Sequence, residues 1–117
     1  MINLKHKNLD VWKLSVKLTT QIYDLTRALP NHELYGLISQ LRRAAVSVPS
    51  NIAEGAAQKS SKERRRFYEI ARSSLVEIDT QLEIARKLSY ITKKDLANVE
   101  NDFEHTFAML SNLIKST

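Results

Sequence analysis

The chain has 117 residues, 43% of them hydrophobic, and its 18 Lys and Arg against 13 Asp and Glu give a formal net charge of +5. It has no cysteine, which excludes disulfides, thiolate metal sites and a cysteine nucleophile. The length predicts a single domain over residues 1–117, built around one core. The opening residues lack the apolar run of a signal peptide, and no stretch is long enough to span a bilayer. We therefore expect a cytoplasmic protein without membrane contacts.

The first predicted helix begins near Asn8 or Asp10, either of which can cap it, and runs to about Leu29, before Pro30. It is apolar on two sides. The main stripe consists of Val11, Leu14, Leu18, Ile22, Leu25 and Leu29, and the second of Leu9, Trp12, Val16 and Tyr23. Trp12 and Tyr23 either widen the core of the chain itself or belong to an oligomer interface.

The second predicted helix covers residues 34–55, and both of its faces are informative. Its core stripe consists of Leu34, Ile38, Leu41, Ala45, Val48 and Ile52. The stripe continues in phase past Pro49, which predicts a kinked helix and not a broken one. We expect Asn51 to bond carbonyls that Pro49 leaves free, and Gly55 to end the helix as a left-handed cap.

The opposite face of this helix is small and polar, so a second surface can pack closely there. It consists of Gly36, Ser39, Gln40, Arg43, Ser47, Ser50 and Glu54. Arg43 lies at its centre, where it would either pair with an acid of a neighbouring subunit or hold a phosphate. We expect Arg43, Ser47 and Glu54, with Trp12 and Tyr23, at an oligomer interface. A structural role for Glu54 is favoured over a catalytic one, because no base or metal set accompanies it.

The third predicted helix opens with a capping box of Ser60 and Glu63 and runs to about Leu88. Its apolar positions are Phe67, Ile70, Ala71, Ser74, Ile78, Leu82 and Ala85. Cations crowd its first turns, where they oppose the helix dipole. Arg65 and Arg72 each have the spacing to pair with Glu69, but such pairs would leave most of the charge free.

The fourth predicted helix starts at a capping box of Thr92 and Asp95. Its apolar stripe consists of Leu96, Val99, Phe103, Phe107, Leu110 and Ile114, and its outer face carries the acids Glu100, Asp102 and Glu104. All the joints between helices are short. The sequence therefore predicts an all-α, antiparallel up-down-up-down four-helix bundle.

Three segments resemble a known family: LDVWKLSVKL, QLRRAAVSVPSNIAEG and KERRRFYEIARSSLVEIDTQLEIARKL. They resemble the small bacterial four-helix bundle proteins encoded in intervening sequences of 23S ribosomal RNA genes. The resemblance covers about residues 9–88, and the last helix fits by pattern only. It implies a bundle that assembles as a homopentamer, similar to the nucleic-acid-binding accessory protein of diversity-generating retroelements. It implies no settled biochemical activity.

The motifs of common enzymes are absent, so we expect no catalytic residues, no cofactor, no metal and no small-molecule substrate. No Glu has a His three positions later, as the di-iron sites of four-helix bundles require. His6, His32 and His105 have no spacing that suggests a ligand set. Two glycines cannot build a phosphate-binding loop.

The sequence predicts a non-enzymatic homo-oligomer that binds nucleic acid, RNA in preference to DNA because of the genomic setting of the family. The phosphate backbone would be held by cations around the joint between the second and third helices. These are Arg42, Lys59, Lys62, Arg64, Arg65, Arg66 and Arg72. The alternative is a structural or adaptor protein whose surfaces serve only protein contacts.

Overall fold

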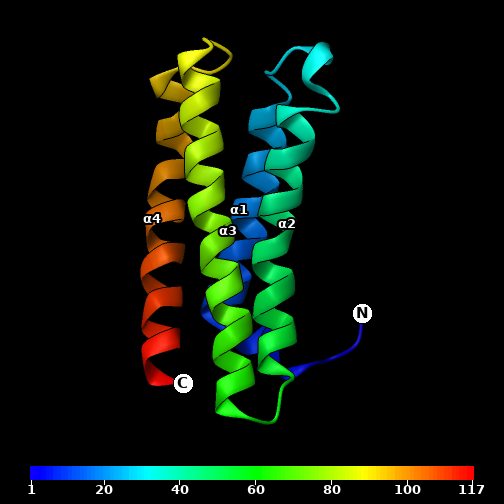
Figure 1. Cartoon of the computed structure of the whole chain (residues 1–117), viewed down its shortest axis with the longest axis vertical. Coiled ribbons are helices and arrows are strands. Elements are labelled where there is room, and N and C mark those ends of the chain that lie inside the picture. The colour runs from blue at the N-terminus through cyan, green and yellow to red at the C-terminus, as the bar shows by residue number, and fades with distance from the viewer.

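Four long helices form the molecule, and the computed structural model describes all of residues 1–117 (Figure 1). The long helices are α1 (Asp10–Thr26), α2 (Leu37–Ala56), α3 (Ser61–Lys87) and α4 (Lys93–Ser116), with short 3-10 helices η1 (Lys5–Asn8) and η2 (Asn31–Glu33). No strand is present, so the predicted all-α four-helix fold is confirmed.

The chain reverses its direction at each joint (Figure 1). Each helix contacts the next one along the chain, and α4 returns to contact α1. The α2–α3 joint and the C-terminus lie at one end of the bundle, whereas η2 and the α3–α4 joint lie at the other. The two ends of the bundle are therefore built from different joints.

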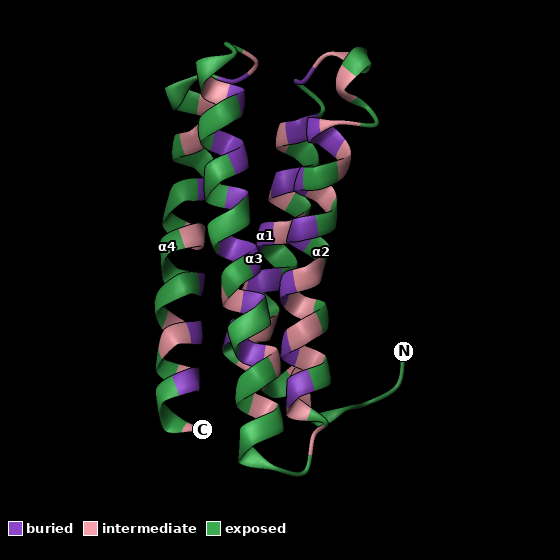
Figure 2. Ribbon diagram, viewed as in Figure 1, coloured by how far each residue is buried: buried purple, intermediate pink, exposed green.

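The core consists of 21 buried apolar residues on the sides of the helices that face one another (Figure 2). On α2, the predicted stripe from Ile38 to Ile52 is buried. Leu34 is an exception with 47% of its surface exposed, because α2 begins only at Leu37. On α1, Asn8 and Asp10 do not cap the helix: Leu9 occupies the N-cap, without a side-chain hydrogen bond. That helix also ends at Thr26 rather than Leu29.

Two further apolar side chains predicted in the core lie outside it. Ile70 is 39% exposed and Phe107 is 37% exposed. On α3, Tyr68 and Leu75 are buried instead. On α4, Thr106 is fully buried, because its hydroxyl donates to the Asp102 carbonyl at 2.6 Å and so brings no unpaired polar group into the core.

The predicted acidic outer face of α4 is also partly wrong, because Asp102 faces α1. Its carboxylate accepts a hydrogen bond from Gln21 at 2.9 Å and forms an ion pair with Lys17 at 3.1 Å. These hydrogen bonds hold the pKa of Asp102 below its ordinary value. Asp102 thus joins α4 to α1 within the chain.

Pro49 lies within α2, which continues without interruption to Ala56. Because proline has no backbone N–H, the carbonyl of Ala45 loses its helical partner. The hydroxyl of Thr19, on α1, lies 3.0 Å from this carbonyl and shares its one proton between it and the Ser15 carbonyl at 2.8 Å. Asn51, the predicted partner, donates to the carbonyl of Ser47 instead, at 2.8 Å. A neighbouring helix therefore compensates for the proline, and the kink remains a prediction.

Gly55 is not the predicted left-handed cap, because no glycine has a positive φ and α2 extends past it. Gly55 is buried against α3. A Cβ atom there would lie 2.7 Å from Cε1 of Tyr68 and 3.0 Å from Cβ of Phe67. The glycine is needed for close approach of the two helices, and burial raises the pKa of the Tyr68 phenol packed on it.

Candidate nucleic-acid interface

The joint between α2 and α3 is short and ordered by its own side chains. Gln58 and Lys59 connect the end of α2 to Ser60, the N-cap of α3. The Ser60 hydroxyl accepts a hydrogen bond from the Glu63 backbone N–H at 3.1 Å, which confirms the predicted cap. The Glu63 carboxylate pairs with Arg66 at 3.6 Å and does not accept the Ser60 N–H. The predicted capping box is therefore only half formed, whereas the one predicted at Thr92 and Asp95 is complete.

Arg64 braces this joint. Its guanidinium donates to the carbonyls of Gln58 and Lys59, at 3.0 and 2.7 Å, and to the hydroxyl of Ser61 at 3.1 Å. The side chain is only partly exposed. Arg64 was predicted as a phosphate ligand, but its donors are directed at carbonyl groups of the joint itself.

The other cations near the joint are exposed. Lys59 and Lys62 take part in none of the four ion pairs of the chain and donate no side-chain hydrogen bond. Arg65 donates to the backbone oxygen of Thr117, and Arg66 lies with its Cζ 5.3 Å from the centre of the Phe67 ring. The first turns of α3 therefore present several cations to solvent in one place.

Arg72 and Arg42 are not part of this cluster. Neither Arg65 nor Arg72 forms the predicted ion pair with Glu69. Arg72 lies between α3 and α4, where it donates to the Ser111 hydroxyl at 3.4 Å. Arg42 lies near the start of α2, 14 residues before Ala56. At a rise of about 1.5 Å per residue, it is roughly 20 Å from the joint.

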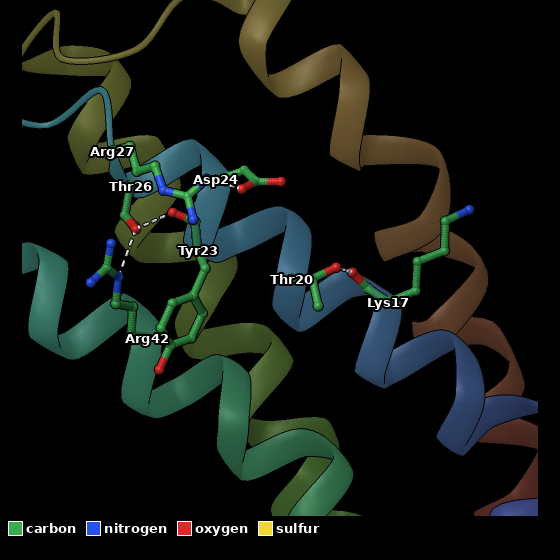
Figure 3. Close-up of polar contacts among 7 residues, drawn as sticks. All are labelled: Lys17, Thr20, Tyr23, Asp24, Thr26, Arg27 and Arg42. Atoms are coloured by element: carbon green, nitrogen blue, oxygen red, sulfur yellow. Dashed lines mark hydrogen bonds and ion pairs between the residues drawn. The ribbon is translucent and has the colours of Figure 1, made fainter.

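The position of Arg42 is fixed by α1 (Figure 3). Its Nε donates to the Thr26 hydroxyl at 2.9 Å, and its Cζ lies 4.7 Å from the centre of the Tyr23 ring. A guanidinium stacked on an aromatic face and hydrogen-bonded at its edge is held in a single orientation. Arg42 therefore joins α1 to α2.

The sequence did not predict that the N-terminal segment lies beside the α2–α3 joint and adds to its basic surface. The short helix η1 contacts both α1 and α2. Leu4, Lys5 and His6 line a groove together with the last turn of α2 and Gln58. The sequence KHKN of η1 could have indicated this, because a basic segment next to the first helix can fold back onto the α2–α3 joint. We define the basic end as the exposed cations Lys5, Lys59, Lys62, Arg65 and Arg66.

The five residues predicted at an oligomer interface do not share one surface. Trp12 is partly buried against the core, with its ring 4.9 Å from that of His6. Ser47 faces α3, where it accepts a hydrogen bond from Ser74 at 2.9 Å. Tyr23 and Arg43 line one groove between α1 and α2, whereas Glu54 lines the groove beside η1. Only Tyr23 and Arg43 lie together on an open surface.

Two further findings concern metal sites and membrane-spanning helices. No group of three or more His, Cys, Asp and Glu side chains is arranged to hold a metal ion. None of the four helices combines the length and the apolar character that crossing a membrane requires.

Comparisons with known proteins agree with the fold. The family model described as "23S rRNA-intervening sequence protein" matches residues 7–112. A crystal structure of a protein of unknown function from the S23 ribosomal protein family of Bacteroides thetaiotaomicron VPI-5482 is similar, with a TM-score of 0.82 and 24% identity. The similarity covers 90% of this chain and 95% of that one. No curated protein matches the chain.

Proposed function

We propose that this protein, which belongs to the 23S rRNA-intervening sequence protein family, is a non-enzymatic homo-oligomer that binds nucleic acid at its basic end. One observation carries the proposal: five exposed cations lie together at the basic end, where Lys59 and Lys62 are unpaired within the chain and adjacent to the N-terminus of α3. The free N–H groups of a helix N-terminus attract anions, and the neighbouring cations add to that attraction.

The mechanism is phosphate capture with little base readout. Lysine and arginine side chains can reach backbone phosphates, and contacts of that kind position a nucleic acid without reading its base edges. Binding of this kind weakens steeply as salt increases, because each neutralised phosphate releases counterions. RNA is favoured over DNA because the family is defined by an intervening sequence of 23S rRNA. The proposed setting is the cytoplasm, where ribosomal RNA is made and used.

Self-association would strengthen this binding. A single basic end with five exposed cations makes few phosphate contacts. Copies of the chain in a symmetric oligomer would present several such ends to one polymer, and the later contacts would then be intramolecular. A pentamer is the assembly that the family resemblance implies.

The test is a pair of charge-matched variants. Lys59→Glu with Lys62→Glu reverses two cations of the basic end. Lys93→Glu with Lys94→Glu reverses two exposed cations in the first turn of α4, at the other end of the bundle. Both variants change the net charge by the same amount, and both place acids near a helix N-terminus, where they suit the helix dipole.

Affinity would be measured by fluorescence anisotropy of a labelled structured RNA and a duplex DNA of equal length. We expect the Lys59/Lys62 variant to bind RNA at least about tenfold more weakly near physiological salt, and the Lys93/Lys94 variant to change little. Equal losses in both variants would mean that only net charge matters and would contradict a site at the basic end. Absence of binding by the wild type at low salt would contradict the proposal altogether.

A second candidate function, an adaptor that binds other proteins, is favoured by one specific observation. Tyr35 is 94% exposed and lies beside Leu34, which is 47% exposed, in the groove between α1 and α2. Exposed apolar clusters of this kind commonly mark protein contacts. A protein that assembles and binds no nucleic acid would support the adaptor function.

A further inference from the structure

Two open grooves on the bundle are lined by exposed apolar side chains. The first lies between α1 and α2, and we call it the Arg43 groove. Tyr23, Leu34, Tyr35 and Val46 provide its exposed apolar surface, and Arg43 is exposed at its edge. Arg42 also lines it, held by Thr26 and Tyr23 as shown in Figure 3. This groove is apolar and basic.

The second groove lies between α3 and α4, and we call it the Glu104 groove. Val76, 55% exposed, and Phe107, 37% exposed, provide its apolar surface. Asp79 and Glu104 line the same groove, are exposed, and form none of the four ion pairs of the chain. This groove is apolar and acidic.

The two grooves lie on opposite faces of the bundle. Contacts join α1 to α2, α2 to α3, α3 to α4 and α4 to α1, whereas no contact joins α1 to α3 or α2 to α4. The helices therefore occupy the corners of a square, and the α1–α2 side is opposite the α3–α4 side. One chain cannot bring its own two grooves together.

We propose that the Glu104 groove of a second copy docks on the Arg43 groove, with Arg43 facing Asp79 and Glu104 of that copy. This inference rests on the self-association part of the proposed function. Complementary charge is the reason for choosing a second copy as the partner, since both halves of the pairing are present in one sequence. Pairing of either groove with itself would instead oppose like charges across the contact.

The size of the faces is compatible with a stable contact. The bundle measures 44 × 25 × 21 Å, so a long face has room for the roughly 800 Å² that each partner of a standard interface contributes. The contact joins two different faces, so the first copy keeps a free Glu104 groove and the second copy keeps a free Arg43 groove. Such an interface continues to further copies until it closes into a ring or extends as a filament.

The test is a charge swap followed by the mass in solution, measured by light scattering on the full chain. Arg43→Glu alone, and Asp79→Arg with Glu104→Arg, each oppose like charges in every contact. We expect each to weaken self-association at least about tenfold and to shift the mass toward the 13.4 kDa protomer. The triple variant that carries all three changes restores opposite charges in every contact, and its mass should return to that of the wild type.

Lys94→Glu, which makes the same charge change as Arg43→Glu outside both grooves, should leave the mass unchanged, and circular dichroism should show equal helix content in all variants. An assembled wild type whose mass Arg43→Glu does not change would overturn the groove pairing, as would a triple variant that stays dissociated. A monomeric wild type would overturn it as well. Nucleic-acid binding is measured separately. A wild type that binds but does not assemble would contradict this inference and the self-association part of the proposed function, whereas a wild type that assembles but does not bind would contradict only the binding proposal.

Discussion

Helices α3 and α4 begin at opposite ends of the bundle, and their first turns use similar residues differently. Each has a hydroxyl residue as its N-cap and an acid three positions later. At the start of α4, the Asp95 carboxylate accepts the Thr92 N–H at 2.9 Å and completes a capping box, which holds the pKa of Asp95 below its ordinary value. At the start of α3, the acid pairs with Arg66 instead.

The end of the bundle with the α3–α4 joint also closes a polar network. The Glu33 carboxylate accepts hydrogen bonds from the Leu37 N–H at 3.2 Å and from the Tyr90 hydroxyl at 3.0 Å, and His32 lies 3.2 Å from that hydroxyl. These contacts join η2 to the joint. At the opposite end, Lys59 and Lys62 have no partner within the chain. The two ends therefore differ in their acids, which close a capping box and a network at one end only. Lys93 and Lys94 are exposed and unpaired at that end, as Lys59 and Lys62 are at the basic end.

The largest effect we expect at the basic end comes from packing and not from charge. In Gly55→Ala, the new Cβ would lie 2.7 Å from the Tyr68 ring, which is buried and cannot move freely. Overpacking costs more than the gain in helix propensity, so we expect a loss of about 1–2 kcal/mol in the free energy of unfolding. Urea denaturation measures it. The same change in a Tyr68→Leu background should cost less, and an equal cost in both backgrounds would contradict the contact.

A smaller loss of stability should distinguish a cation that is hydrogen-bonded to the joint, Arg64, from one that is unpaired, Lys62. Arg64→Gln removes the donors to the Gln58 and Lys59 carbonyls, and we expect it to lower the free energy of unfolding by about 1 kcal/mol. Lys62→Gln, two positions earlier and without a partner, should change stability by less than about 0.5 kcal/mol. In nucleic-acid binding the order should reverse, with Lys62→Gln the more damaging change. Equal stability losses would show that Arg64 does not brace the joint.

The smallest effect concerns the network at the other end. The Leu37 N–H, and after it the Tyr90 hydroxyl, hold the pKa of Glu33 below 4.5. A lowered folded pKa means that this carboxylate stabilises the fold above its unfolded pKa, and that the contribution is lost as the pH falls through the folded pKa. Tyr90→Phe should raise the pKa of Glu33 only partway to 4.5, because the Leu37 bond remains.

An NMR titration of the Glu33 side chain measures this shift directly. Tyr35→Phe is the matched control, because Tyr35 is almost fully exposed and makes no side-chain hydrogen bond to Glu33. Its effect on the pKa of Glu33 should be negligible. An unchanged pKa in Tyr90→Phe would mean that the hydroxyl does not contribute to the network.

Sequence periodicity was sufficient for the four helices, for the buried stripe from Ile38 to Ile52, and for the caps at Ser60 and Thr92. These features depend on neighbouring positions in one segment. The errors in side-chain contacts have a common cause: a helical period gives the direction of a side chain but not the helix it meets. Thr19 as partner of the carbonyl freed by Pro49 could not be read from α2 alone.

The sequence predicted which cations lie near the α2–α3 joint better than it predicted the contacts that those cations make. A run of cations after Gln58 indicated a basic joint, and the structure places most of them there. The sequence could not show that Arg64 folds back onto the joint or that Arg42 stacks on Tyr23, because both depend on tertiary contacts. Gly55 was assigned to a cap by its place near a helix end, whereas contact with Tyr68 explains it.

The salt dependence of binding shows whether the cations of the basic end hold nucleic-acid phosphates. The dissociation constant for a labelled RNA would be measured over a range of salt for the wild type and for Lys59→Glu with Lys62→Glu. Each lost phosphate contact reduces the slope of the log–log plot by about 0.7–0.9, so we expect a slope that is smaller by roughly 1.5 in the variant. Identical slopes would show that Lys59 and Lys62 touch no phosphate and would contradict phosphate binding by these two residues.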